Sequence, residues 1–139
     1  MSMFELTGKV ALITGGAHSI GFAIGVAFAK AGATVCFNCS NEASCKRGIE
    51  AYAAEGITVH GYVADVTNEE DVRSLVDQIR EEIGIVDILV NNAGIIKRIP
   101  MTDMSVDDFS KVIDVDLIAP FICSKAVIPG MIEKGHGKI

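Results

Sequence analysis

The chain has 139 residues and a formal net charge of −6, and half of its residues are hydrophobic while 22% are charged. This length suits one domain with a sizeable core, and the composition is not that of a disordered chain. The negative charge, with no cluster of Lys and Arg to offset it, argues against binding of nucleic acid. Tryptophan is absent and Ala, Val, Ile and Leu dominate, which favours a parallel sheet between helices.

No targeting or membrane segment is predicted. Residues 1–8 lack the basic and apolar regions of a signal peptide. The most hydrophobic stretch, residues 117–132, is interrupted by Pro120, Lys125 and Pro129, and it is shorter than the roughly 20 apolar residues of a membrane span. We therefore predict a cytoplasmic protein with neither membrane nor nucleic acid among its partners.

Short apolar runs alternate with helical periodicities along the whole chain. The predicted strands are residues 10–13, 35–37, 58–63 and 86–90, and the predicted helices are 19–31, 41–55, 67–83 and 105–134. This alternation predicts an α/β fold with a Rossmann-type, doubly wound parallel sheet and right-handed crossovers. In such sheets ligands bind beyond the carboxyl ends of the strands.

Three local features are predicted within these helices. Thr67 begins a capping box that opens the third helix. Pro120 kinks the long last helix rather than ending it, because helical spacing resumes after it. The first helix presents one buried apolar stripe, made of Ile20, Ala23, Ile24, Ala27, Phe28 and Ala31.

Four cysteines stand at positions 36, 39, 45 and 123. The spacing of Cys36 and Cys39 is that of a zinc or redox pair, but no second pair of ligands follows. Positions three apart in a strand also point to opposite faces. We interpret all four as buried or half-buried, reduced thiols and predict no metal site.

The first predicted strand runs directly into the turn Thr14–Gly21, of sequence TGGAHSIG. Gly15 and Gly21 would let the backbone turn tightly and bring its N–H groups close to a pyrophosphate. The positive end of the helix that begins near Ser19 would add to this attraction. The spacing is longer than G-x-G-x-x-G, so the turn alone is weak evidence of a dinucleotide site.

Two further strand ends carry polar turns. Strand three ends at Asp65 and Val66, where a carboxylate could accept a hydrogen bond from an adenine amino group. Strand four ends in Asn91-Asn-Ala-Gly94. Because the ends of parallel strands meet at one edge of a sheet, three such turns indicate a shared dinucleotide site.

The end of strand two favours NADP over NAD. A site for NAD usually has an acid there for the ribose 2′-OH, whereas this chain has Asn38-Cys-Ser-Asn41 and no acid before Glu42. A 2′-phosphate would therefore be tolerated, and Ser40, Asn41 and a helix N-terminus could receive it. His18, Lys46 and Arg47 are candidates to assist, although each could simply be solvated.

These motifs together resemble the short-chain dehydrogenase/reductase family, along the whole chain. Residues 91–101 and 112–117 resemble its gluconate 5-dehydrogenase (5-keto-gluconate reductase) members. The resemblance implies hydride transfer between a nicotinamide and a sugar acid. The cofactor would be bound by Gly15, Ala17, His18, Ser19, Ile20, Gly21, Cys39, Ser40, Asp65, Val66, Asn92, Ala93 and Gly94.

Two positions depart from the usual family pattern. Ser19 stands where glycine is usual; its Cβ should crowd the turn, while its hydroxyl could donate to phosphate. Asp116 stands where most members have an asparagine that supports a proton-relaying water, although gluconate 5-dehydrogenase-like sequences share the aspartate. Helical spacing places Asp116 on the stripe of Phe109, Val112 and Ile113. There it would either serve the relay or contact a backbone donor near Pro120.

The resemblance also implies a catalytic Ser, a Tyr, and a Lys four residues after the Tyr. Tyr52 and Tyr62 are followed at that spacing by Gly56 and Val66. We therefore expect the catalytic residues to lie after Ile139. Residues 1–139 would then be the dinucleotide-binding portion of one domain, truncated at the start of a fifth strand and inactive alone.

Other functions stay open at this point. Another short-chain reductase, acting for instance on a 3-oxoacyl thioester, would share every motif, and a non-catalytic dinucleotide-binding module would explain the missing Tyr and Lys. A methyltransferase is a further alternative, but it would usually have an acid at the end of strand two, and this chain has none there. Lys97 and Arg98 could meet an acidic substrate or be solvated. The long helix resembles the family's tetramer-forming helix, so the complete protein is expected to be a homotetramer.

Overall fold

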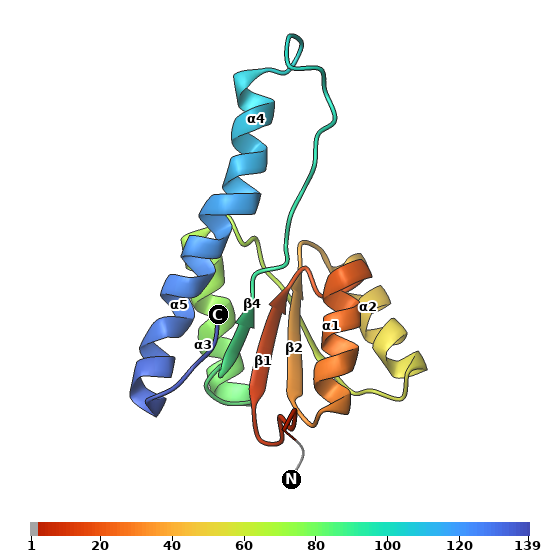
Figure 1. Ribbon diagram of the computed structural model, residues 1–139, viewed down its shortest axis with the longest axis vertical. Coiled ribbons are helices and arrows are strands. Elements are labelled where there is room, and N and C mark those ends of the chain that lie inside the picture. Colours follow the sequence, from red (N-terminus) through yellow and green to blue (C-terminus); the bar gives the residue numbers. More distant parts are fainter. Residues whose placement is uncertain (1–2) are drawn as a thin grey trace.

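The chain folds around one parallel sheet (Figure 1). The computed structural model describes residues 3–139. The sheet has the order β3-β2-β1-β4, and all three pairs of neighbouring strands are parallel. Its strands are β1 (Val10–Thr14), β2 (Thr34–Cys39), β3 (His60–Val63) and β4 (Ile88–Val90). This arrangement confirms the predicted α/β doubly wound fold, although strands three and four begin two residues later than predicted.

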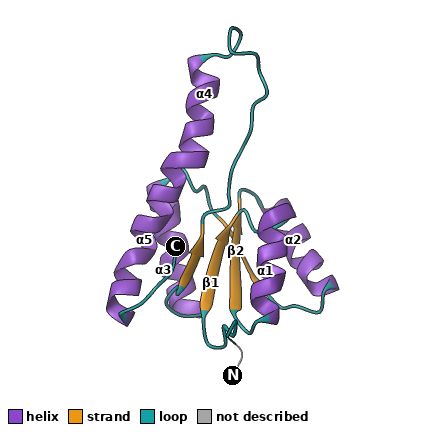
Figure 2. Cartoon of the chain, in the orientation of Figure 1, coloured by secondary structure: helices purple, strands orange, loops and turns teal. Residues whose placement is uncertain are grey.

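Helices cover both faces of the sheet (Figure 2). On one face α1 (Ser19–Lys30) and α2 (Glu42–Ala54) enclose a core built on Ile13, Phe37 and Tyr52. On the other, α3 (Glu69–Glu82) and α5 (Ala119–Lys134) cover a core that contains Leu12, Cys36 and Val127. Successive strand residues alternate between the two cores, as the pleat requires. Cys36 and Cys39 accordingly lie in different cores, and all four cysteines are buried and free.

The predicted apolar stripe of α1 is buried only in part: Ile24 and Phe28 pack against the core, whereas Ala23 and Ala27 are exposed. Its first member, Ile20, is 71% exposed, and the residues of α1 that are buried are Gly21 and Gly25. A Cβ at Gly25 would lie 2.0 Å from the Tyr52 hydroxyl, which donates to the Gly16 carbonyl at 2.9 Å. The helix therefore approaches its neighbours along glycines, a contact that a periodicity of large apolar residues does not reveal.

Asparagine and serine side chains cap the starts of three other helices. Asn41 accepts the Ser44 N–H at the start of α2, and Ser105 accepts the Asp108 N–H at the start of α4 (Val106–Ile113). The cap of α3 is Asn68, which accepts the Asp71 N–H, and not Thr67 as predicted. The Thr67 hydroxyl instead donates to Asp65 at 2.6 Å, so the start of α3 moves by one residue.

The predicted irregularity at Pro120 takes the form of a π-helical turn, η1 (Asp114–Ile118), between α4 and α5. Because proline has no N–H, the turn before it lacks one donor, and the Ala119 N–H bonds to the Asp114 carbonyl five residues back. In Figure 1, α4 and the loop that precedes it extend away from the sheet.

By length and composition alone, the continuous helical run Val106–Lys134 could cross a membrane, although the apolar stretch within it was predicted to fall short. Core helices of soluble proteins meet the same criterion. In this run Ala119, Cys123, Val127 and Met131 are buried in the core beside the sheet. We therefore interpret the run as a helix of the fold.

Asp87 ties together three segments at the amino end of the sheet. Its side chain is 1% exposed, accepts the Val10 N–H at 2.8 Å and forms an ion pair with Lys134. Its backbone carbonyl accepts the Lys138 N–H at 3.0 Å, so the last residues run beside β4. Burial would raise the pKa of Asp87, but the bonds from Lys134 and Val10 outweigh it and hold the pKa below its ordinary value.

Replacing Asp87 with alanine should lower the free energy of unfolding by about 3 kcal/mol, because it removes one member of a buried ion pair and leaves the Val10 N–H unsatisfied. Since folding lowers the pKa of Asp87, its contribution should be complete above the unfolded value of about 3.9 and disappear as the pH falls through the folded value. Urea denaturation of the full-length protein at pH 7 and in acid would measure both effects. Glu70→Ala, in an exposed ion pair, is the control and should change stability by less than about 0.5 kcal/mol.

Candidate functional site

A cavity of about 380 Å³ opens at the carboxyl ends of the four strands. It brings together every residue predicted to bind a cofactor except Gly21. It is lined by Gly15, Ala17, His18, Ser19, Ile20, Asn38, Cys39, Ser40, Ser44, Ala64, Asp65, Val66, Thr67, Asn92, Ala93, Gly94, Ile95 and Val115. Six of these lining residues were not predicted to bind the cofactor, and most of them adjoin predicted ones. They are Asn38, Ser44, Ala64, Thr67, Ile95 and Val115.

Side chains from β1 and from the turn after β4 lock the start of the glycine-rich turn. The Thr14 hydroxyl accepts the N–H groups of Asn92 and Ala93 at 3.1 and 3.0 Å. The Asn92 amide in return donates to the carbonyls of Thr14 and Gly15, each at 3.1 Å. The glycine-rich turn and the Asn-Asn-Ala-Gly turn, far apart in sequence, therefore form one hydrogen-bonded unit at the carboxyl edge of the sheet.

The two predicted glycines serve different purposes. Gly15 has a φ of +63°, so it takes the left-handed conformation that the turn needs. Gly21 lies behind the cavity rather than on its wall, where an added Cβ would come within 2.5 Å of the Asn92 amide and 2.8 Å of the Gly15 carbonyl. Gly21 thus lets α1 start against the locked turn, so that its first residues, Ser19 and Ile20, line the cavity.

Ser19 adopts a φ of +52°, which is rare for a residue with a Cβ. The predicted crowding of the turn by Ser19 is therefore present as backbone strain. The hydroxyl lies 3.2 Å from the His18 ring nitrogen, and both side chains are exposed at the cavity. Both can turn toward a bound anion.

The wall at the end of β2 is uncharged apart from one nearby arginine. Cys39 is buried, and burial, with the neighbouring Cys45, raises the pKa of its thiol to about 12, so it stays protonated. Ser40 is exposed at the rim. Ser44 accepts a hydrogen bond from Arg47 at 3.0 Å, which holds a guanidinium at the start of α2. Among the described residues that line the cavity, Asp65 carries the only carboxylate.

Asp65 is partly engaged by its own turn. Its Oδ1 accepts both the backbone N–H and the hydroxyl of Thr67, at 2.9 and 2.6 Å. One oxygen thereby shapes the entry to α3. Only Oδ2 is then left to accept a hydrogen bond from a ligand. The sequence motif did not indicate that the two oxygens have different roles.

Asp116 lies beside the Asn92-Ala-Gly94 turn, but it is not on a buried stripe as predicted. Both Asp116 and Phe109 are exposed: neither α4 nor the π-helical turn has a buried residue, because this part of the helix extends away from the sheet (Figure 1). Asp116 Oδ1 accepts the Ile95 N–H at 2.9 Å. The backbone donor thus belongs to the loop after β4 and not to the Pro120 region.

Neither tyrosine is arranged as a general acid or base. Tyr52 is fully buried with its hydroxyl on Gly16, and burial raises its pKa to about 12. Burial, together with the hydrogen bond to Glu82, also raises the pKa of Tyr62. A catalytic phenol needs the opposite shift, so both tyrosines are structural.

The two cations after β4, Lys97 and Arg98, lie in different environments. Lys97 forms an ion pair with Asp108 at 2.5 Å. Hydrogen bonds from Lys97 and Ser105 hold the pKa of Asp108 below its ordinary value. Arg98 is exposed. Of the two predicted contacts for an acidic substrate, Lys97 is therefore already engaged.

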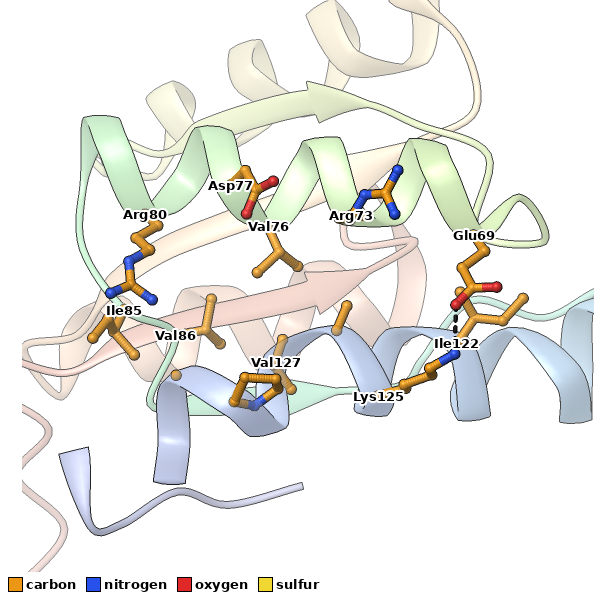
Figure 3. Close-up of a pocket in the computed structure, with 13 residues that line it drawn as sticks. Glu69, Arg73, Val76, Asp77, Arg80, Ile85, Val86, Ile122, Lys125 and Val127 are labelled. Atoms are coloured by element: carbon orange, nitrogen blue, oxygen red, sulfur yellow. Dashed lines mark hydrogen bonds and ion pairs between the residues drawn. The ribbon is translucent and has the colours of Figure 1, made fainter. Parts of the chain in front are cut away.

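A second hollow, of about 460 Å³, lies between α3 and α5 (Figure 3). An ion pair between Glu69 and Lys125 spans it at 2.6 Å, and its floor includes Val76 and Val127. Although larger, it is away from the carboxyl ends of the strands and contains none of the predicted motifs. Within residues 3–139, no group of three His, Cys, Asp or Glu side chains could hold a metal ion.

Comparison with known proteins agrees with this geometry. Residues 9–139 match the family described as short chain dehydrogenase. The chain is 43% identical, over 140 residues, to 2-dehydro-3-deoxy-D-gluconate 5-dehydrogenase of Formosa agariphila, covering all of this chain and 53% of that protein. It is 36% identical over 137 residues to 5-keto-D-gluconate 5-reductase of Escherichia coli, covering 99% and 54%.

Solved structures give the same picture. The 2-keto-3-deoxy-D-gluconate dehydrogenase of Streptococcus agalactiae superimposes with a TM-score of 0.89 at 60% identity, over 98% of this chain and 51% of that one. A gluconate 5-dehydrogenase of Burkholderia cenocepacia, in complex with NADP and tartrate, has a TM-score of 0.89 at 38% identity, over 98% and 53%. The chain thus spans about half the length of the relatives it matches.

Replacing Ser19 with glycine should raise the free energy of unfolding by about 0.5 kcal/mol. A left-handed conformation costs a residue with a Cβ about 1–2 kcal/mol, and the greater freedom of unfolded glycine cancels about 0.5–1 kcal/mol of that gain. Thermal unfolding of the full-length protein would measure the difference. Ser19→Ala, which keeps the Cβ and removes only the hydroxyl, is the control; a gain as large as that of glycine would contradict strain as the cause.

Proposed function

Because the chain belongs to the short-chain dehydrogenase/reductase family, we propose that the full-length protein is an NAD(P)-dependent oxidoreductase that interconverts a hydroxyl and a ketone of a sugar acid. The convergence of the Thr14–Gly21 turn, Asp65 and Asn92-Ala-Gly94 on one cavity carries the proposal. Such a cofactor supplies hydride transfer at its nicotinamide when bound. The residues of this chain bind and orient it.

The cavity fits a dinucleotide chemically. A chain of net charge −6 must hold a pyrophosphate by local donors, and the first turn of α1 offers unpaired N–H groups and a positive dipole end. Gly15 and Gly94 let neighbouring segments of the wall approach closely: a Cβ would lie 3.1 Å from Ala93 Cα at the first and 3.3 Å from Asp116 Oδ1 at the second. The residues named from the sequence, Gly21 included as support, would hold the cofactor.

We favour NADP over NAD because of the wall at the end of β2. Cys39 is neutral, Ser40 is exposed, and Arg47 is held close by Ser44. A 2′-phosphate would meet hydroxyls, a helix N-terminus and a guanidinium, and no carboxylate among the described lining residues at the end of β2, which are Asn38, Cys39, Ser40 and Ser44. The solved complex of the Burkholderia relative with NADP supports this choice.

A sugar acid of the gluconate or 5-keto-gluconate type is the proposed substrate. Relatives named for 5-keto-gluconate and for 2-dehydro-3-deoxy-gluconate support the class. Arg98, the exposed cation after the Asn92-Ala-Gly94 turn, could attract the substrate carboxylate. The family's catalytic Ser, Tyr and Lys would follow Ile139, and Asp116 would support the proton relay while it fixes the Ile95 backbone.

The proposed setting is a cytoplasmic homotetramer. The helical run after Asp114 exposes Leu117, Phe121, Ile128 and Ile132. Apolar side chains repeated on one side of a helix commonly mark an interface, and the resemblance of this helix to the tetramer-forming helix of the family supports a self-contact.

The first experiment is the intact mass and activity of the protein expressed from its complete gene. We expect a mass near twice 14.7 kDa, oxidation of NADPH when 5-keto-gluconate is added, and reduction of NADP when 2-keto-3-deoxy-gluconate is added. Acetoacetyl-CoA is the comparison substrate. Faster turnover of the thioester would contradict the sugar-acid proposal, and no turnover of any of the three would leave a dinucleotide-binding module.

Replacing Ser40 with aspartate should raise the Kd for NADPH at least tenfold and change that for NADH much less, since a carboxylate at the rim repels only the 2′-phosphate. Ser40→Asn has nearly the same size without the charge and should keep the original preference. Fluorescence titration of the full-length protein with each cofactor would measure both constants. Equal losses for the two cofactors would place the 2′-phosphate elsewhere.

A further inference from the structure

Asn38 is a buried polar side chain, 3% exposed, at the end of β2. The two ends of its amide contact different parts of the cavity wall. Oδ1 accepts the Gly15 N–H at 2.9 Å, and Nδ2 donates to the Ala64 carbonyl at 2.9 Å. One side chain thus joins the turn after β1 to the segment after β3, across the strand that lies between them.

Among side chains of this size, only a neutral amide satisfies both contacts. It offers an acceptor at one end and a donor at the other. The aspartate of the same shape would keep the Gly15 bond but place a carboxylate oxygen against the Ala64 carbonyl, and it would bury a charge. Leucine would leave the Gly15 N–H and the Ala64 carbonyl without partners.

These bonds have two consequences for a ligand in the cavity. The Gly15 N–H is occupied by Asn38, so phosphate oxygens must be bound by later N–H groups of the turn and of α1. The Ala64 carbonyl directly precedes Asp65, whose side chain lines the cavity. Asn38 therefore sets the separation between the phosphate-facing turn and the wall around Asp65, while Asn92 holds the same turn from the side of β4.

We propose that Asn38 is a positioning residue for the dinucleotide, which keeps the pyrophosphate turn and the adenosine wall in register so that both halves of the cofactor bind together. The inference rests on the proposed function, because it needs a dinucleotide in this cavity. It assigns a specific requirement to a residue outside the glycine-rich, Asp-Val and Asn-Asn-Ala-Gly motifs. Binding of the whole dinucleotide should depend on Asn38 far more than binding of one half.

The test compares Asn38→Asp with the unaltered full-length protein at a temperature well below the midpoint of thermal unfolding of the variant. The Kd for NADPH should rise at least tenfold. The Kd for adenosine 2′-monophosphate, which would contact the adenosine wall without reaching the turn, should rise less than threefold. A loss of stability alone would change neither constant in the folded fraction.

Asn68→Asp is the matched control. Asn68 is an exposed cap of α3, and aspartate caps helices equally well, so both constants should be unchanged. If Asn38→Asp does not fold, Asn38→Ser, which can satisfy one of the two ends, is judged by the same ratio. Equal losses for NADPH and adenosine 2′-monophosphate, or no loss for either, would overturn the role of Asn38. Failure of the unaltered protein to bind NADPH would instead overturn the proposed function.

Discussion

The structure depends on hydrogen bonds that hold the end of the central strand from both sides. Backbone groups of Thr14 and Gly15 leave the sheet where β1 ends, and in a buried setting each needs a new partner. Asn38 supplies an acceptor from β2, and Asn92 supplies two donor contacts from the turn after β4. The side chains that satisfy this buried backbone are the same ones that shape the cavity. Stability and ligand geometry are therefore not separable at this edge.

At the opposite edge of the sheet, where the strands begin, a charged side chain holds the neighbouring segments together. Asp87 gathers the start of β1, the entry to β4 and the segment after α5 through Val10, Lys134 and Lys138. An amide suffices at the carboxyl edge because both of its partners are neutral backbone groups. A carboxylate suits the amino edge because one partner is a lysine. The two ends of one sheet are thus fastened by different chemistry, and only the neutral one faces the cavity that would receive an anionic cofactor.

The order of elements and most of the cavity wall could be predicted because they follow from local signals. Alternating apolar runs indicated the strands, and turns at their ends indicated the wall. The errors arose where a distant contact decided the outcome. Gly21 and Gly25, rather than Ile20, are buried in α1 because Asn92 and Tyr52 occupy the space beside them. Asp116 is exposed because the helix around it extends away from the sheet, and neither α4 nor the π-helical turn has a buried residue. Asn38 was overlooked as a positioning residue because an isolated asparagine in a strand has no motif.

The contact between α1 and α2 has an evolutionary consequence. The Tyr52 hydroxyl occupies the place that a Cβ at position 25 would fill, and it uses that position to reach the Gly16 carbonyl. The two positions therefore share one volume. Within the family, a lineage that gains a larger residue at position 25 should carry a smaller one at position 52, and it must find another donor for the carbonyl at position 16. The pair should evolve as a correlated unit, detectable as covariation between positions 27 residues apart.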